Sequence, residues 1–201
     1  RKNNLKASGV ATKQGERENH IMYFKSNKTV AYYDCDVNDN IKISAAIRLM
    51  QQTSSEHLKS IRVPVQMLYQ EGFAFLLTKT CLKVHQLPKA TEEIVIGTAA
   101  TQIKGPRFYR EFTIEDSSGN HYMDALTLWI LVEPDTRRII RPTECPYEIP
   151  IQQSITQGAI ENITLPKIGE MTPIIEHTRP VYYSFLDVNQ HMNNSYYADF
   201  V

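Results

Sequence analysis

The sequence predicts an α+β fold in which one long helix lies against an antiparallel sheet. Residues 43–61 carry apolar side chains at helical spacing, and residues 73–132 contain long segments with the two-residue alternation of strands. A short motif near residue 36 also returns near residue 187. One long helix set against several antiparallel strands is buried only if the sheet covers it.

The chain begins with a polar stretch, residues 1–20, that has no hydrophobic periodicity. We expect it to be a disordered arm or an expression remnant. TVAYYD, residues 29–34, is expected to form a short strand. ISAAIRLMQQTSSEHLKSI, residues 43–61, is expected to form a helix with one packed face, and Asn40 or Ser44 is its candidate N-cap.

Long strands are expected to follow the helix, separated by turn signals. They cover residues 73–86, 93–103, 107–116 and 121–132. The stretch DSSGN before the last strand is typical of a hairpin. We therefore expect an N-terminal domain over residues 21–150 and a linker over residues 151–177.

Composition narrows the class of function. The 22 basic and 22 acidic side chains give a formal net charge of zero, which argues against a general nucleic-acid binder. No apolar run approaches the roughly 20 residues of a membrane span. Cys35, Cys81 and Cys145 are far apart, so we expect free thiols in a reducing compartment. No cofactor fingerprint and no metal-ligand spacing stands out, so neither group is expected.

An internal repeat relates the two ends of the chain. AYYDCDVNDN, residues 31–40, and VYYSFLDVNQH, residues 181–191, share Tyr-Tyr followed by Asp-Val-Asn. The second copy reads as having one extra residue between these two elements. The repeat predicts a duplicated domain, whose second copy covers residues 178–201. The copies differ at one chemically telling position, where His191 replaces Asn40.

The second copy concentrates reactive side chains in Asp187, Asn189 and His191. In an extended segment, residues spaced by two point to the same side and would converge. A histidine can act as general base toward water at neutral pH, an aspartate can orient it, and an amide can hold a carbonyl oxygen. A helix beginning at Asn193 or Asn194 would add unpaired backbone N–H groups. This set suits hydrolysis of an activated acyl group.

Other interpretations of these turns remain open. An Asn/Asp-rich turn before a helix is most often a cap. The D-x-N-x-N pattern at Asp36 suggests a calcium loop, but Ile41 and Ile47 stand where that loop needs Gly and Glu. A zinc site would need more ligands than His191 and Asp187 offer.

The stretch LDVNQHMNNSYY, residues 186–197, resembles the hallmark loop of the acyl–acyl-carrier-protein thioesterases of bacteria and plant plastids. Two further stretches resemble segments of the same family in the same order. They are IKGPRFYREFTIEDSSG, residues 103–119, and ALTLWILVEPDTRRIIRP, residues 125–142. The resemblance implies two fused hot-dog domains, each a long helix wrapped by an antiparallel sheet, the second incomplete in this chain.

The resemblance also implies the reaction, which is hydrolysis of fatty acyl-acyl carrier protein to free fatty acid. Asp187, Asn189 and His191 match the catalytic Asp-x-Asn-x-His of the family, and its further acidic residue would follow Val201. The alternatives are a hot-dog acyl-CoA thioesterase and a module that binds acyl thioesters without cleaving them. Neither nucleic-acid binding nor a membrane span is expected, and the sequence leaves open whether the protein forms a homodimer.

The implied partner is acyl carrier protein carrying a fatty acyl chain, in the bacterial cytoplasm or in the plastid stroma of a plant. A candidate docking patch for it comprises Lys104, Arg107, Arg110, Arg137, Arg138 and Arg141. The acyl tail is expected between the helix and the sheet, beside Ile47, Met50 and Met67.

Overall fold

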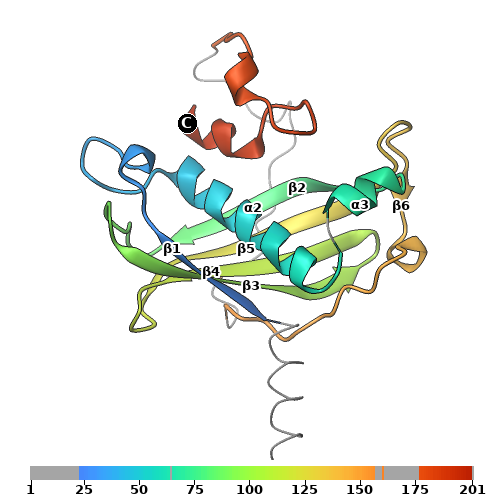
Figure 1. The fold of residues 1–201 in the computed structure, drawn as a ribbon, viewed down its shortest axis with the longest axis horizontal. Coiled ribbons are helices and arrows are strands. Elements are labelled where there is room, and N and C mark those ends of the chain that lie inside the picture. Colours follow the sequence, from blue (N-terminus) through green and yellow to red (C-terminus); the bar gives the residue numbers. More distant parts are fainter. Residues whose placement is uncertain (1–22, 64, 157–159, 161–176, 201) are drawn as a thin grey trace, which may run out of the picture.

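The computed structural model describes residues 23–63, 65–156, 160 and 177–200. Within them, an antiparallel sheet curls around a long helix, α2 (Figure 1). The strands are β1 (Phe24–Thr29), β2 (Ala74–Val84), β3 (Glu93–Lys104), β4 (Arg107–Glu115), β5 (His121–Val132) and β6 (Ile139–Ile140). The helices are α2 (Ile43–Ser60), α3 (Val65–Gln70) and the short 3-10 helices η1 (Tyr32–Asp34), η2 (Pro142–Glu144), η3 (Tyr183–Phe185) and η4 (Asn194–Asp199).

The strand order is β1-β3-β4-β5-β2, with β6 paired to the end of β5. The expected helix and the strands expected after it are confirmed, and α3 was not predicted. The pairing slips between Leu77 and Lys79 in β2 and between Ala100 and Gln102 in β3. Such bulges bend a strand and increase its twist, which helps the sheet to wrap around the helix.

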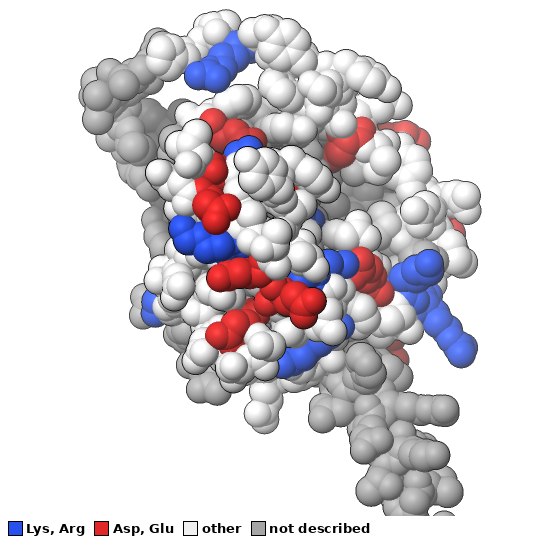
Figure 2. Space-filling view, turned by 60° about the vertical axis from the view of Figure 1, so that its left-hand side comes forward, with Lys and Arg blue, Asp and Glu red and all other residues white. Residues whose placement is uncertain are grey.

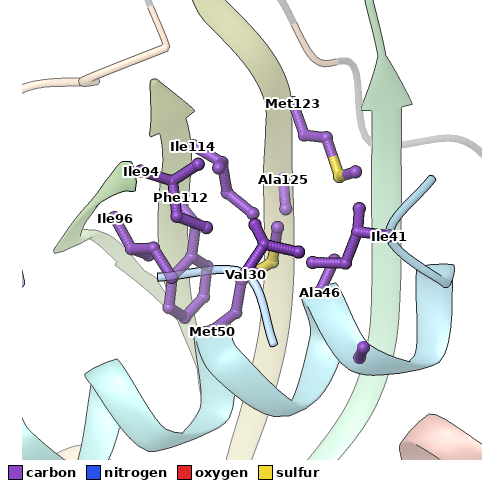
Figure 3. Packing of buried hydrophobic residues seen from close by; sticks show 11 residues of the cluster. Val30, Ile41, Ala46, Met50, Ile94, Ile96, Phe112, Ile114, Met123 and Ala125 are labelled. Carbon is purple, nitrogen blue, oxygen red and sulfur yellow. The ribbon is translucent and has the colours of Figure 1, made fainter. Parts of the chain in front are cut away.

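The main core lies between α2 and the concave face of the sheet. Ala45, Ala46 and Met50 of the helix are buried in one cluster with side chains of β3, β4 and β5 (Figure 3). The small alanines let the helix approach the strands closely. Phe112 of β4 fills the centre and is 1% exposed. Burial of a side chain of this size stabilises the fold by about 1.5–3 kcal/mol.

The segment before α2 differs from the prediction. β1 ends at Thr29, and Tyr32–Asp34 form a 3-10 helix instead of continuing the strand. The carboxylate of Asp36 accepts backbone hydrogen bonds just downstream, and such local bonds compete with a strand ladder. Lys42 stands at the N-cap of α2 without a side-chain bond, so the predicted caps at Asn40 and Ser44 are wrong.

The convex face of the sheet holds the first residues of the expected linker. Glu111 is 8% exposed, and its Oε2 accepts hydrogen bonds from the Ser154 hydroxyl, from the Ile155 N–H and from the N–H and hydroxyl of Thr156, at 2.8–3.0 Å. A buried carboxylate with several donors is well satisfied. The expected arm over residues 1–20 and most of the linker over residues 151–177 lie outside the described residues. In the described part of the chain, no helix is long and apolar enough to cross a membrane.

Candidate active site

The two Asp-Val-Asn segments fold into the same tight turn. In the first copy, the Asp36 N–H donates to the Asn40 carbonyl at 2.8 Å. In the second copy, the Asp187 N–H donates to the His191 carbonyl at 2.9 Å. Each bond closes a five-residue turn and carries residue 40 or 191 to its end. The structure therefore confirms that His191 occupies the place of Asn40.

Each turn is also capped by its own aspartate. Asp36 Oδ1 accepts from the Asn38 N–H at 2.8 Å, and Asp187 Oδ1 accepts from the Asn189 N–H at 2.9 Å. Backbone hydrogen bonds, above all the one from Asn40, hold the pKa of Asp36 below its ordinary value. The capping interpretation thus accounts for both aspartates. It does not account for an imidazole in the second turn.

Inside the turns and upstream of them, the residues of the two copies correspond at a constant offset of 151 residues. The 3-10 helix at Tyr32–Asp34 matches the one at Tyr183–Phe185. Asp39 and Gln190 both have a left-handed backbone, with φ of 66° and 60°. The second copy therefore needs no extra residue: Tyr32 corresponds to Tyr183, and the apparent insertion in the sequence is a coincidence of adjacent tyrosines.

The predicted route by which the three candidate residues converge is wrong. Residues 187–191 form a turn, not an extended strand, so two-residue alternation does not set their directions. Asp187 is half-buried, whereas Asn189 and His191 are exposed. In this fully described turn no hydrogen bond joins the side chains of Asp187 and His191. The structure brings the three residues into one turn, and their catalytic roles stay a prediction.

Contacts with α2 hold the second turn in place. The predicted helix start at Asn193 or Asn194 is confirmed, since η4 begins at Asn194. Asn193 is its N-cap, because its Oδ1 accepts from the Ser195 N–H at 2.9 Å. Its Nδ2 donates to Gln51 Oε1 of α2 at 3.2 Å. One helical turn earlier, the Arg48 guanidinium lies 5.9 Å from the centre of the Tyr196 ring. Figure 1 shows this C-terminal segment in red against α2.

A small cavity opens between α2 and the sheet. Its walls are Ile47, Met50, Gln51, Leu77, Thr80, Phe112, Thr127 and Trp129. The predicted places of Ile47 and Met50 beside the helix–sheet space are confirmed. Met67 is not a wall residue, since it lies on α3 with 45% of its surface exposed. Gln51 was not predicted as a wall residue, although it follows Ile47 by one helical turn.

Arg110 does not belong to the predicted docking patch. It is 5% exposed, and its Nη1 lies 2.9 Å from His57 Nδ1 and 3.1 Å from Thr98 Oγ1. Burial lowers its pKa to about 10, so it keeps its charge at neutral pH. Arg110 lies two residues before the buried Phe112 on the same strand, so both side chains face the same side of the sheet. Strand alternation in the sequence could therefore have predicted that Arg110 points inward.

Charged side chains are mixed near the first turn. Figure 2 shows this end of the molecule, with acidic side chains interleaved with lysines and arginines.

On the convex face of the sheet, Asp124 accepts hydrogen bonds from His85 at 2.7 Å and from His121 at 2.8 Å. Among the described residues, no group of three or more metal-binding side chains is arranged to hold an ion.

A long helix wrapped by an antiparallel sheet defines a hot-dog fold. The sequence model of the acyl-ACP thioesterase N-terminal domain matches residues 22–149, and the chain belongs to this family. It is 23% identical over 193 residues to the chloroplastic palmitoyl-acyl carrier protein thioesterase of Cuphea hookeriana, covering 90% of this chain and 46% of the relative. The chain thus spans about half the length of the curated relatives it matches.

Two solved structures support the same fold. The acyl-ACP thioesterase of Bacteroides thetaiotaomicron matches with a TM-score of 0.77 at 16% identity, over 92% of this chain and 73% of that one. The 12:0-ACP thioesterase of Umbellularia californica matches with a TM-score of 0.65 at 20% identity, over 89% and 69%. Both matches extend beyond the first hot-dog unit of this chain.

Proposed function

We propose that the protein hydrolyses the thioester of fatty acyl-acyl carrier protein and releases a free fatty acid. The observation that carries this proposal is the placement of the second turn. The turn that bears His191 is joined by Asn193 to Gln51, and Gln51 is a wall of the cavity beneath α2. The turn that carries the candidate base is therefore tied by one hydrogen bond to a wall of the cavity proposed for the acyl chain. Family membership supports the reaction class.

In the proposed mechanism, the His191 imidazole takes a proton from a water molecule, and the oxygen of that water attacks the thioester carbonyl carbon. The tetrahedral intermediate collapses with loss of the thiolate, which takes the proton back from the imidazolium. The Asn189 amide donates to the carbonyl oxygen, where negative charge develops. Asp187 keeps the turn in shape through its cap on Asn189. The products are a free fatty acid and the carrier thiol.

The acyl tail is proposed to enter the space between α2 and the sheet. The cavity there is small, so a long chain enters only if its walls move. Met50 is suited to such movement, because methionine is unbranched and fills irregular space in several conformations. Replacing Met50 with the larger, rigid Trp should shift the preference toward shorter chains, as measured by hydrolysis rates over a series of chain lengths.

The proposed partner is acyl carrier protein, because the similar plant proteins are palmitoyl-acyl carrier protein thioesterases. Those relatives are also named chloroplastic, so the plastid stroma is the proposed compartment if the source is a plant, and the cytoplasm if it is a bacterium. The remaining basic patch, without Arg110, is the proposed docking surface.

A direct assay separates this proposal from its alternatives. The full-length protein is incubated with acyl-acyl carrier protein and acyl-CoA of several chain lengths, and the free thiol is measured. We expect faster release from the carrier protein. Release from acyl-CoA alone would favour the acyl-CoA thioesterase, and binding without thiol release would favour a non-catalytic module.

A further inference from the structure

Gln51 belongs to two parts of the molecule at once. It is a wall of the cavity between α2 and the sheet, and its Oε1 accepts a hydrogen bond from Asn193, 142 residues further along the chain. Both side chains are half-buried. A hydrogen bond shielded in part from water restrains its two groups more than an exposed one. The contact therefore fixes the end of the second turn relative to the cavity.

Asn193 uses both ends of its amide. The carbonyl oxygen caps η4 by accepting from the Ser195 N–H at 2.9 Å, which leaves the NH₂ group to donate to Gln51. Its own backbone N–H donates to the Phe185 carbonyl at 2.9 Å and so closes the loop that contains His191. Residue 193 thus ties together the loop, η4 and α2.

The first copy lacks this connection. Lys42 corresponds to Asn193, and its N–H donates to the Asp34 carbonyl at 2.9 Å in the same way. Its side chain does not cap α2, and its Nζ reaches the Tyr33 carbonyl at 3.4 Å. The backbone bond is thus common to both copies, while the side-chain link to a cavity wall occurs in the copy with the histidine.

We propose that Gln51 and Asn193 are positioning residues, whose hydrogen bond sets the His191 turn at a fixed place relative to the acyl cavity. The inference rests on the proposed function and deepens it, because it assigns residues outside the Asp-x-Asn-x-His turn to the placement of the base. A chain seated in the cavity presents its thioester to His191 only while this bond holds the turn against α2.

The test uses two variants that remove the hydrogen bond between Gln51 and Asn193 but keep the cavity wall and the N-cap of η4. Gln51→Met retains the length of the side chain and the cavity wall but removes the acceptor. Asn193→Ser retains an N-cap acceptor but is too short to reach Gln51. Gln52→Met is the matched control, since Gln52 lies next to Gln51 on the exposed side of α2 and donates to Glu56 at 3.1 Å.

Kinetics of the full-length protein should show a loss of turnover without a loss of binding. We expect kcat on acyl-acyl carrier protein to fall about tenfold in Gln51→Met and in Asn193→Ser, because a small displacement of a catalytic group is costly. The KM should stay within about twofold, since the cavity is kept. The double variant should be no worse than either single one. Multiplying losses, or a rise in KM alone, would overturn the proposal.

Amide hydrogen exchange tests the same contact without relying on activity. Exchange of the peptide covering residues 185–196 should accelerate about fivefold in Gln51→Met, the effect expected for loss of one hydrogen bond, and should be unchanged in Gln52→Met. Equal exchange in wild type and Gln51→Met would overturn the positioning role. Inactivity of the wild type with faster exchange in Gln51→Met would instead retain the contact and reject the proposed reaction.

Discussion

The two turns of the repeat have the same backbone geometry but differ in the contacts that hold them in place. The first is built into its own domain, because Asn40 pairs with Lys89 and the Ile41 N–H donates to the Pro88 carbonyl at 2.9 Å. The second is held, among the described residues, by contacts with α2: Asn193 donates to Gln51, and the Tyr196 ring lies near the Arg48 guanidinium. One turn is part of a scaffold, whereas the other is presented to that scaffold.

This difference separates structural residues from candidate chemical ones. Both turns need an aspartate to cap the backbone, and both carry Asn at the third position, as Asn38 and Asn189. The identity of the two aspartates therefore reflects the geometry of the turn, whereas these bonds involve only the backbone N–H of Asn38 and Asn189. His191 and Asn193 are not required by that geometry, since Asn40 and Lys42 satisfy it in the first copy.

The largest expected effect comes from removing the imidazole. His191→Ala should lower the rate of acyl-acyl carrier protein hydrolysis by about 10²–10⁴-fold, the usual contribution of a general base. Asn40→Ala is the matched control and should leave the rate nearly intact. Equal losses in both variants would show that the two turns do not differ in role.

Removing the capping aspartates should separate activity from stability. Asp187→Ala should lower kcat by about tenfold or more, because the turn that presents His191 loses its cap. Asp36→Ala should lower the melting temperature and leave kcat close to the wild-type value. Thermal unfolding and kinetics on the same preparations check both expectations, and a large kcat loss in Asp36→Ala would contradict the scaffold role of the first turn.

Acid should weaken the first turn. The pKa of Asp36 is lower in the fold than in the unfolded chain, so its contribution is present above the unfolded value, about 3.9, and is lost as the pH falls through the folded pKa. Asp36→Asn keeps an acceptor without the charge. Its melting temperature should lie below that of the wild type at pH 6, and the gap should narrow as the pH falls below about 3.9. A gap independent of pH would disprove this linkage.

The smallest effect is expected at the far end of the sheet. β3 has 12 residues, from Glu93 to Lys104, so its two ends are about 36 Å apart at about 3.3 Å per residue. Lys89, which pairs with Asn40 of the first turn, shortly precedes Glu93, so the patch near Lys104 lies far from that turn. Reversing Arg137 and Arg138 to Glu should raise the KM for acyl-acyl carrier protein a few-fold, less so at high salt. A small thioester substrate should be unaffected. Equal changes with both substrates would remove the docking patch.

The strands and the long helix could be predicted because their alternation and helical spacing persist over many residues. His121–Val132 and the expected strand share both ends. Successive side chains of this strand face the core and the covered outer face in turn, so most of them are buried. The 3-10 helix at Tyr32–Asp34 could not be predicted in this way. Its tyrosines favour strands, and the Asp36 side chain overrides that preference locally.

For the candidate site, the repeat in the sequence pointed to His191, but not to how it is placed. Contacts such as Gln51 with Asn193 join residues 142 positions apart, and no local pattern encodes them. Arg110 shows the opposite case. Its charge suggested the surface, while its register beside Phe112 on β4 already placed it inside.

Exchanging the two residues that distinguish the turns tests the central claim most directly. The double variant Asn40→His/His191→Asn contains the same side chains as the wild type, with the imidazole moved to the scaffold turn. Thiol release from acyl-acyl carrier protein should fall as far as in His191→Ala, because the imidazole no longer lies on the turn that Asn193 holds beside the cavity. Release at the wild-type rate would contradict the account, since either turn could then serve as the active site.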